Sequence, residues 1–277
     1  MFVWLASYPK SGNTMIRALL SSYFFSKDGI FNFELIKNIK QFPHKALFIK
    51  NGIDITNEKE VIKNYLKVQE SFNIKNSIQF LKTHSYLFNI ENNPFTKLEY
   101  SLGVIYVVRD PRNVVLSVSN HNSQSDEKSA DDLIKGRIIN DEKNVKVYAG
   151  TWSDNFNSWK SFKSGNKYLL IKYEDMINDK DKTFYEILKF IHNLKKVEFV
   201  LDKKKFQNVI ESTNFEQMQK LENKYGFHES MVNKKTGKNV KFFNLGKKTD
   251  WKTSLNENIK NKIEEKFEKE MKELRYL

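Results

Sequence analysis

Hydrophobic positions at the start of the chain follow two different periods in succession. Residues 2–7 (FVWLAS) form a short, nearly continuous apolar run, which is typical of a buried central strand in a parallel sheet. A polar turn follows at residues 10–13. From Thr14 the apolar residues recur at helical spacing, at Met15, Ile16, Leu19, Leu20 and Tyr23. A strand, a glycine-containing turn and a helix are the first unit of many nucleotide-type α/β folds.

Three further apolar runs predict strands, at residues 78–82, 103–108 and 168–172. Pro111 lies just after the third strand and opens a predicted helix, because proline is favoured in the first helical turn. Another predicted helix carries Trp152, Phe156 and Trp159 and precedes the fourth strand. From about Asp181 the pattern is mostly helical, and residues 255–277 form a charged amphipathic helix that we expect on the surface.

The alternation of four strands with helices indicates the α/β class. We expect a P-loop-like, three-layer α/β/α fold with a central, mainly parallel sheet, built as a single domain over residues 1–277. The sequence shows no internal repeat, and the Lys/Asn-rich stretches 50–64 and 230–241 are predicted to be loops rather than domain linkers. Ligands of open α/β sheets bind at the carboxyl ends of the strands, where the polar motifs of this chain lie.

Composition excludes several classes of protein. Hydrophobic residues make up 39% and aromatic residues 14% of the 277 residues, which excludes a disordered chain. The absence of cysteine excludes a disulfide framework, a thiolate nucleophile and a Cys-ligated metal site. No stretch reaches the roughly 18 apolar residues that a bilayer requires. The opening apolar segment has no basic region before it, so we expect a cytoplasmic protein without a transmembrane segment.

The net charge of +13, from 47 basic and 34 acidic residues, favours an acidic partner. Nucleic acid, anionic lipid, nucleotides and sulfated or phosphorylated small molecules all satisfy this condition. The excess is mostly lysine in a chain rich in Asn and Ile, a bias that low-GC coding alone can produce. Charge therefore does not identify the partner.

The turn at Tyr8–Thr14 (YPKSGNT) has the properties of a phosphate site. A strand that feeds a tight glycine turn and then a helix presents a row of backbone N–H groups, and the helix dipole adds positive potential. Lys10 adds a point charge, and Ser11, Asn13 and Thr14 supply further donors. The lysine precedes Gly12, so the turn is not the GxxxxGK[ST] pattern.

Two more polar motifs follow predicted strands. Arg109 lies at a strand end and Ser117 eight residues later in the next helix, so both can converge on one anion. Lys82 and His84 are two positions apart and face the same side of an extended strand. One of this pair can act as a general base and the other as a charge stabiliser.

In this order, the motifs resemble those of the sulfotransferases that use 3′-phosphoadenosine 5′-phosphosulfate (PAPS) as sulfuryl donor. YPKSGNT is similar to the family's 5′-phosphosulfate loop, RDPRNVVLS to its 3′-phosphate motif, and KTH to the strand that carries the catalytic histidine of cytosolic members. Tyr173 in KYEDM and Phe215 in STNFEQM match positions that contact adenine. Residues 242–252 (FFNLGKKTDWK) resemble the C-terminal RKGxxGDWK segment, which implies a donor contact at Gly246. The resemblance covers roughly residues 2–275.

Three departures from the family pattern bear on the expected donor site. Met15 stands where the family has tryptophan, which weakens ring stacking near the adenine. Asn244 and Leu245 replace an Arg-Lys pair that holds the 3′-phosphate, a loss for which Lys247 and Lys248 could compensate. The dimer signature of the cytosolic branch is not recognisable, so the oligomeric state stays open.

The resemblance implies transfer of a sulfuryl group from PAPS to a hydroxyl or amine acceptor by in-line displacement, with PAP as the product. His84 is expected to be the general base, and Lys10 and Lys82 to stabilise the leaving phosphate and the bridging oxygen. Arg109 with Ser117 would hold the 3′-phosphate. The turn would hold the 5′-phosphate through the backbone amides of Ser11, Gly12, Asn13, Thr14 and Met15. A sulfuryl group carries one negative charge where a phosphoryl group carries two, so we expect no metal.

The acceptor cannot be read from the sequence. A small molecule, a glycan and a lipid headgroup all stay open, with the acceptor lined by loops such as 31–60, 86–100 and 120–150. We expect no nucleic acid partner for such an enzyme.

Three other interpretations compete with this one. A P-loop-type nucleotide kinase or hydrolase would need an acidic Mg²⁺ ligand after a strand, and Asp110 is the obvious candidate. A basic, non-catalytic polyanion-binding protein would bind RNA or membrane surfaces in a salt-dependent way. A sulfotransferase fold with a degenerate site would keep the architecture but lose the activity.

Overall fold

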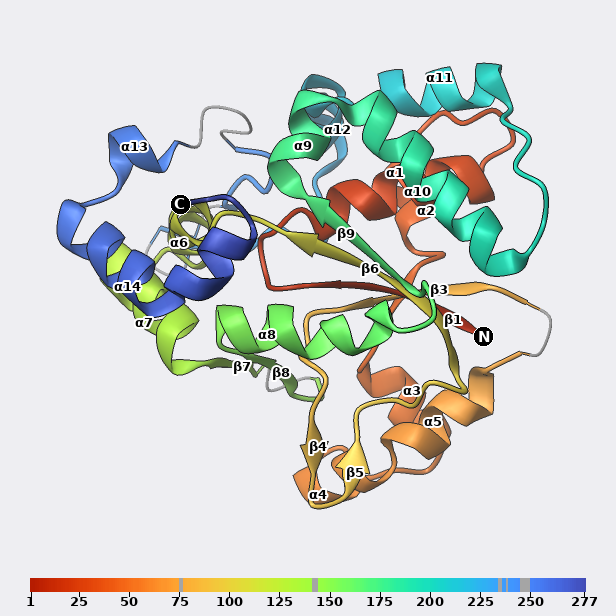
Figure 1. The fold of residues 1–277 in the computed structure, drawn as a ribbon, viewed down its shortest axis with the longest axis horizontal. Helices are drawn as coiled ribbons and strands as arrows, with labels where there is room; N and C mark the ends of the chain where they lie inside the picture. Colours follow the sequence, from red (N-terminus) through yellow and green to blue (C-terminus); the bar gives the residue numbers. More distant parts are fainter. Residues whose placement is uncertain (75–76, 141–143, 234–235, 238, 245–249) are drawn as a thin grey trace.

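The structure is a computed structural model that describes residues 1–74, 77–140, 144–233, 236–237, 239–244 and 250–277. Its centre is a parallel sheet in the order β2-β3-β1-β6-β9 (Figure 1). The strands of this sheet are β1 (Phe2–Ser7), β2 (Lys40–Gln41), β3 (Gln79–Thr83), β6 (Ser101–Val108) and β9 (Tyr168–Lys172). The four strands predicted from sequence are confirmed, and the two-residue strand β2 at the edge is an addition.

Two small antiparallel pairs lie outside the central sheet. The first joins β4 (Asn89–Ile90) to β5 (Asn93–Pro94), and the second joins β7 (Arg137–Ile139) to β8 (Val147–Gly150). The second pair falls within the segment 120–150, which the sequence pattern had left as a loop.

Helices account for most of the remaining chain. They are α1 (Asn13–Phe25), α2 (Phe33–Ile36), α3 (Lys45–Lys50), α4 (Glu58–Lys63), α5 (Tyr65–Phe72), α6 (Pro111–Asn122), α7 (Asp126–Lys135), α8 (Trp152–Trp159), the 3₁₀ helix Lys160–Lys163, α9 (Tyr173–Asn178), α10 (Lys180–Lys195), α11 (Lys203–Ser212), α12 (Phe215–Tyr225), α13 (Trp251–Ser254) and α14 (Glu257–Glu273). The prediction that residues 50–64 form a loop is wrong in part. Asn57 caps α4 by accepting a hydrogen bond from the amide of Glu60, and Val61 and Ile62 of that helix are buried.

Side chains of the central strand β1 divide between two hydrophobic cores, because successive residues of a strand point to opposite faces. Phe2, Trp4 and Ala6 pack into a core shared with α3, α5, α8 and α14. Val3 and Leu5 pack into a second core shared with α1, α10 and α11. The helices lie above and below the sheet in Figure 1, so the expected three-layer α/β/α fold is confirmed.

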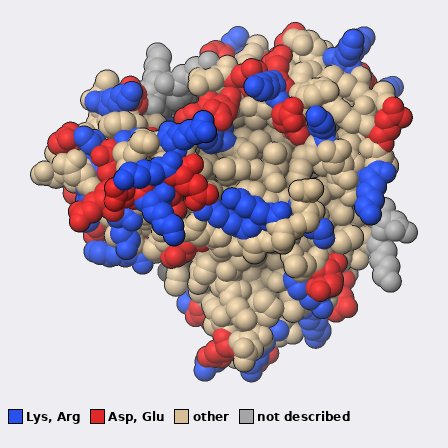
Figure 2. Space-filling model, in the orientation of Figure 1, with Lys and Arg blue, Asp and Glu red and all other residues tan. Residues whose placement is uncertain are grey.

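Charged side chains on the face shown in Figure 2 are mixed rather than sorted by sign. Asp131 of α7, for example, pairs with Lys135 of its own helix and with Lys262 of α14. A net charge of +13 does not therefore produce one uniform basic patch on this face. No helix within the described residues is long and apolar enough to span a membrane.

Candidate active site

A cavity of about 830 Å³ lies at the carboxyl ends of the strands of the central sheet. Segments that follow β1, β3, β6 and β9 contribute to its wall, together with α6, the β7–β8 pair and the stretch after α12. Most residues predicted for the site line this one cavity: Lys10, Gly12, Asn13, Thr14, Met15, Lys82, His84, Arg109, Ser117, Tyr173 and Phe215. The polar motifs meet because parallel strands bring their carboxyl ends to the same edge of the sheet.

The turn between β1 and α1 has a backbone shape that depends on glycine. Gly12 has φ of +106° and precedes Asn13, where α1 begins. A Cβ atom at Gly12 would lie 2.5 Å from Cδ2 of Tyr173, so the turn packs directly against the residue that follows β9. Lys10 also adopts a left-handed conformation, with φ of 66°. The N–H groups of Asn13 and Thr14, the first two residues of α1, can serve an anion there.

The polar side chains of this turn differ in their surroundings. Asn13 donates its amide hydrogens to the carbonyl oxygen of Leu5 at 2.8 Å and to Oγ of Ser7 at 3.2 Å, so it ties the turn to β1. Ser11 is fully buried and is absent from the cavity lining. The amide of Met15 donates to the carbonyl oxygen of Gly12 at 3.0 Å. Within the described residues, Oγ of Ser11 and Oδ1 of Asn13 have no hydrogen-bond partner, and the roles of both residues in ligand binding stay predictions.

Arg109 connects the two predicted anion sites. Its Nη1 atom donates to the carbonyl oxygen of Lys10 at 3.2 Å, and its guanidinium lies 4.3 Å from the ring centre of Tyr173. The side chain is buried, and its Nε atom has no hydrogen-bond partner within the described part of the chain. An orphan buried donor of this kind is costly unless a ligand satisfies it. Ser117 lies further along α6 and lines the same cavity.

His84 follows β3 and is held by the last residue of β1. Its Nδ1 atom lies 2.9 Å from the carbonyl oxygen of Ser7 and 3.2 Å from Oγ of the same residue. Burial and the neighbouring Lys82 ammonium lower the pKa of His84 to about 3, so the imidazole is neutral at physiological pH. The lone pair of the neutral ring is free to accept a proton, but a base with so low a pKa accepts one less readily than a base whose pKa lies near the operating pH.

Lys10 and Lys82 line the same cavity as His84. Burial lowers the pKa of Lys10 to about 7, although the carboxylate of Glu229 opposes the shift. The Lys10 ammonium lies 3.8 Å from the ring centre of Phe242. Burial also lowers the pKa of Lys82, again against the effect of Glu229.

The structure adds residues that the sequence analysis missed. Glu229 contacts Arg17 at 2.8 Å and Lys82 at 3.0 Å, and it accepts a hydrogen bond from Oγ1 of Thr14 at 3.1 Å. Arg17 lies one turn after Thr14 on α1, which is a helical spacing that could have indicated it. Glu229 lies in no recognisable motif.

His121 is a second histidine in the cavity wall. Burial, with Lys10 and Arg137 as further causes, lowers its pKa to about 3. Its Nδ1 atom has no hydrogen-bond partner within the described residues. The sequence analysis assigned no role to this histidine.

Glu222 of α12 fixes the segment that closes one side of the cavity. Its carboxylate accepts hydrogen bonds from the amides of Phe242 at 2.7 Å and Phe243 at 2.9 Å. Phe215, Phe242, Phe243 and Asn244 all line the cavity. The expected donor contact at Gly246, and the compensating residues Lys247 and Lys248, lie outside the described residues.

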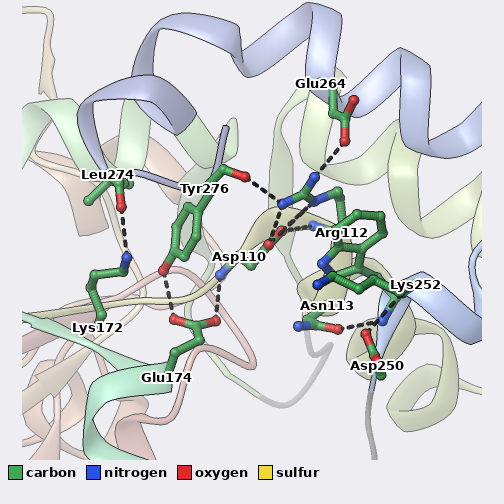
Figure 3. A network of polar contacts seen from close by, with 11 residues as sticks. Asp110, Arg112, Asn113, Lys172, Glu174, Asp250, Lys252, Glu264, Leu274 and Tyr276 are labelled. Atoms are coloured by element: carbon green, nitrogen blue, oxygen red, sulfur yellow. Dashed lines mark hydrogen bonds and ion pairs between the residues drawn. The ribbon is translucent and has the colours of Figure 1, made fainter.

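A polar network around Asp110 and Arg112 joins the segment after β6 to the C-terminal part of the chain (Figure 3). Arg112 pairs with Asp110 at 2.7 Å and with Glu264 of α14 at 2.5 Å, and it donates to the carbonyl oxygen of Tyr276 at 2.9 Å. Glu174 accepts hydrogen bonds from the Asp110 amide at 3.0 Å and from the Tyr276 hydroxyl at 2.8 Å. Asp110 is thus committed to Arg112 and to the start of α6, which leaves it a poor candidate for a Mg²⁺ ligand.

The cavity wall contains residues from two of the three segments that were expected around an acceptor. Gln41 comes from 31–60, and several residues come from 120–150, with Arg137, Asn144 and Val147 among them. Within the described residues, none of the lining comes from 86–100. The same part of the chain contains no group of three or more His, Asp or Glu side chains placed to hold a metal ion.

These features define a protein of the P-loop-like α/β/α class with a cavity at its strand ends that is lined by several basic side chains. Comparison with known proteins makes the assignment specific. The sulfotransferase domain profile matches residues 2–275, and the chain belongs to the sulfotransferase family.

The curated relatives are similar over nearly the whole chain. Sulfotransferase 1E1 of Mus musculus is 23% identical over 279 residues, which cover 97% of this chain and 83% of the relative. Flavonol 3-sulfotransferase of Flaveria bidentis is 24% identical over 276 residues, covering 97% and 81%. The chain is therefore a transferase of the sulfotransferase type.

Solved structures share the fold at lower sequence identity. Retinol dehydratase in complex with retinol and PAP aligns with a TM-score of 0.63 and 18% identity, covering 98% of this chain and 81% of that one. Mouse sulfotransferase SULT7A1 complexed with PAP aligns with a TM-score of 0.56 and 20% identity, covering 97% and 83%.

Proposed function

We propose that this chain, acting as a single domain, transfers a sulfuryl group from PAPS to a hydroxyl or amine of an acceptor and releases PAP. One observation supports this proposal above the others. The turn after β1 and the arginine after β6 lie against one cavity and are joined by the hydrogen bond from Arg109 to the Lys10 carbonyl. Two anion-binding groups side by side suit a nucleotide that carries phosphate at both its 3′ and 5′ positions.

The residues present fit such a nucleotide. The unpartnered Nε atom of Arg109 and the neighbouring Ser117 would hold the 3′-phosphate. The amides at the start of α1 and the Lys10 ammonium would hold the 5′-phosphate. Tyr173 and Phe215 would contact the adenine from two sides of the cavity, where Met15 offers a polarisable side chain in place of a ring.

The cavity also contains groups suited to the transfer step. PAPS supplies an activated sulfuryl group whose transfer places negative charge on the oxygen between phosphorus and sulfur. His84 would take the proton of the acceptor at Nε2, since its Nδ1 atom faces the Ser7 carbonyl. Lys82 and Lys10 would stabilise the bridging oxygen and the leaving phosphate. No step of this scheme needs a metal ion.

The acceptor would occupy the part of the cavity that the donor leaves free. That part is walled by the β7–β8 pair and by Gln41, and it mixes amide, aliphatic and cationic side chains. A small molecule, a glycan and a lipid headgroup are all compatible with this wall. The name of one relative, flavonol 3-sulfotransferase, suggests a small hydroxylated acceptor.

Two of the competing interpretations lose support. A magnesium-dependent kinase would need Asp110, whose carboxylate is instead paired with Arg112. A polyanion-binding protein would present an extended basic surface, and the one face drawn in Figure 2 shows none. A transfer assay distinguishes a degenerate sulfotransferase site from an active one.

Thermal unfolding with added nucleotides tests the proposal. A bound ligand raises stability by RT ln(1 + [L]/Kd). PAP should raise the melting temperature well ahead of AMP, ADP and ATP at equal concentration, and sulfur-35 from PAPS should appear in acceptor pools incubated with the protein. Equal shifts for all four nucleotides would contradict donor binding, and PAP binding without transfer to any pool would indicate the degenerate site.

A further inference from the structure

A buried charge cluster lies at the side of the first turn of α1. The carboxylate of Glu229 contacts Nη2 of Arg17 with both oxygens at 2.8 Å, and one oxygen also contacts Nζ of Lys82 at 3.0 Å. The other oxygen accepts a hydrogen bond from Oγ1 of Thr14 at 3.1 Å. The side chains of Arg17, Lys82 and Glu229 are only 3%, 9% and 19% exposed.

Two of these partners also belong to the proposed donor site. Thr14 lies in the turn that would hold the 5′-phosphate, and Lys82 is the proposed stabiliser of the bridging oxygen. Glu229 therefore uses groups that an anionic ligand would need. Within the described part of the chain, it is the only carboxylate among the residues that line the cavity.

Glu229 is ionised in this environment. Burial alone would raise its pKa, but the Lys82 ammonium and the Arg17 guanidinium hold the pKa well below its usual range. Two anionic groups at hydrogen-bond distance from the same ammonium repel each other strongly in a cavity of low dielectric constant. An anionic ligand at Lys82 and Thr14 therefore competes with the carboxylate, most directly for the single hydroxyl hydrogen of Thr14.

Arg17 provides a place for the carboxylate to remain. It contacts both oxygens of Glu229, it is buried on α1, and it is absent from the cavity lining. Glu229 itself lies four residues after the end of α12, in a stretch without helix or strand. A change of its side-chain rotamer can therefore release Thr14 and Lys82 without disturbing a regular element.

We propose that Glu229 is a specificity-determining residue that competes with ligands for Thr14 and Lys82. A ligand group of high charge density, such as a phosphosulfate or pyrophosphate, displaces the carboxylate, whereas weakly binding anions such as chloride and acetate do not. This inference rests on the proposed function for the position of the donor's 5′ end. It assigns to Glu229 the rejection of weaker anions at that end.

Calorimetric titration with PAP and with inorganic pyrophosphate tests the competition. Glu229→Gln keeps the shape and an acceptor oxygen for Arg17 but removes the charge, so both ligands should bind at least about tenfold more tightly than to the parent. Glu186→Gln, on the exposed side of α10, removes the same charge away from the cavity and should match the parent. Chloride should compete with pyrophosphate in Glu229→Gln only.

An unchanged or weaker affinity of Glu229→Gln for both ligands would overturn the inference. Should this variant fail to fold, Glu229→Asp gives the same test, since the shorter side chain cannot span Arg17, Thr14 and Lys82 together and should strengthen binding several-fold. Failure of the proposed function has a different signature. In that case the parent shows no preference for PAP over AMP, while the pyrophosphate titrations still report the effect of Glu229.

Discussion

The Nδ1 atom of His84 lies 2.9 Å from the backbone carbonyl oxygen of Ser7, the last residue of β1. A carbonyl oxygen only accepts hydrogen bonds, so Nδ1 carries the proton of the neutral ring and Nε2 keeps its lone pair. The sheet thereby selects the tautomer of the proposed base, because β1 and β3 are neighbouring strands with a fixed register.

Replacement of His84 tests this assignment. We expect His84→Ala to lower the rate of sulfur-35 transfer from PAPS by about 10²–10⁴-fold, the usual contribution of a general base. PAP affinity should change little. His192→Ala, on α10 and absent from the cavity lining, is the matched control. Turnover of His84→Ala within a few-fold of the parent would remove His84 from the mechanism.

Arg109 should be specific for the 3′-phosphate. We expect Arg109→Ala to weaken PAP binding by about 1.5–3 kcal/mol, because a hydrogen bond to a charged group is lost. AMP lacks the 3′-phosphate, so its affinity should fall much less in the same variant. Calorimetry with both nucleotides checks the difference. Equal losses for PAP and AMP would mean that Arg109 only supports the turn through Lys10.

Lys10 should make PAP binding depend on pH. Its pKa of about 7 in the free protein means that the ammonium is charged below pH 7 and neutral above it. Binding of an anion favours the charged form of Lys10. Above pH 7 the neutral amine must take up a proton when PAP binds, so PAP affinity should fall progressively with rising pH, by up to about tenfold per pH unit. Lys10→Arg keeps its charge over the whole range.

The comparison of parent and Lys10→Arg isolates this effect. Ionisation of the PAP phosphates influences both proteins equally, so the ratio of the two affinities reports the lysine alone. Affinities measured from pH 6 to 9 should diverge above pH 7. A constant ratio would show that Lys10 stays charged throughout.

Gly12 should tolerate no side chain. In Gly12→Ala the new Cβ would meet the Tyr173 ring at 2.5 Å in a backbone conformation with φ of +106°. We expect this variant to lose PAP affinity as well as stability, because the turn and Tyr173 must move apart to make room for the added atom. Gly165→Ala also has a positive φ, of +82°, but nothing within 4 Å of the added atom.

Gly165→Ala therefore measures the backbone cost alone, about 1 kcal/mol. Urea unfolding gives the stability of both variants, and calorimetry gives their PAP affinity. Gly12→Ala with the stability and affinity of Gly165→Ala would contradict the close packing of the turn on Tyr173.

Arg112 should matter for stability rather than for ligand contact. Removal of one partner from a buried ion pair typically costs about 3–5 kcal/mol, since the remaining charge stays buried. We expect a loss of this size in Arg112→Met, which leaves Asp110 and Glu264 without their guanidinium (Figure 3). Arg275→Met removes an exposed arginine near the same end of the chain and should change urea unfolding little.

The sequence was sufficient to predict the sheet and most of the cavity wall. Apolar runs marked β1, β3, β6 and β9, and the polar residues after each run had to meet at one edge because the strands are parallel. His84, Arg109 and Tyr173 could be placed on this basis alone. Their roles came from the resemblance of their motifs, which spacing could not provide.

Side-chain direction explains most of what could not be predicted. Ser11 and Asn13 have suitable side chains for a ligand, but the tight turn points Ser11 into the protein and Asn13 back to β1. Arg112 stands three residues from Arg109, yet it pairs with Asp110 and Glu264 whereas Arg109 donates to the Lys10 carbonyl. Glu229 is 215 positions from Thr14, and only the three-dimensional fold brings them together.

The division of the cavity wall has an evolutionary consequence. The groups proposed for the donor and for proton transfer sit on the ends of hydrogen-bonded strands and at the starts of helices, where small shifts are not tolerated. The opposite wall, around Gln41 and the β7–β8 pair, is built on short peripheral elements. Substitutions there can diversify the choice of acceptor across descendants of this chain while the transfer chemistry is inherited unchanged.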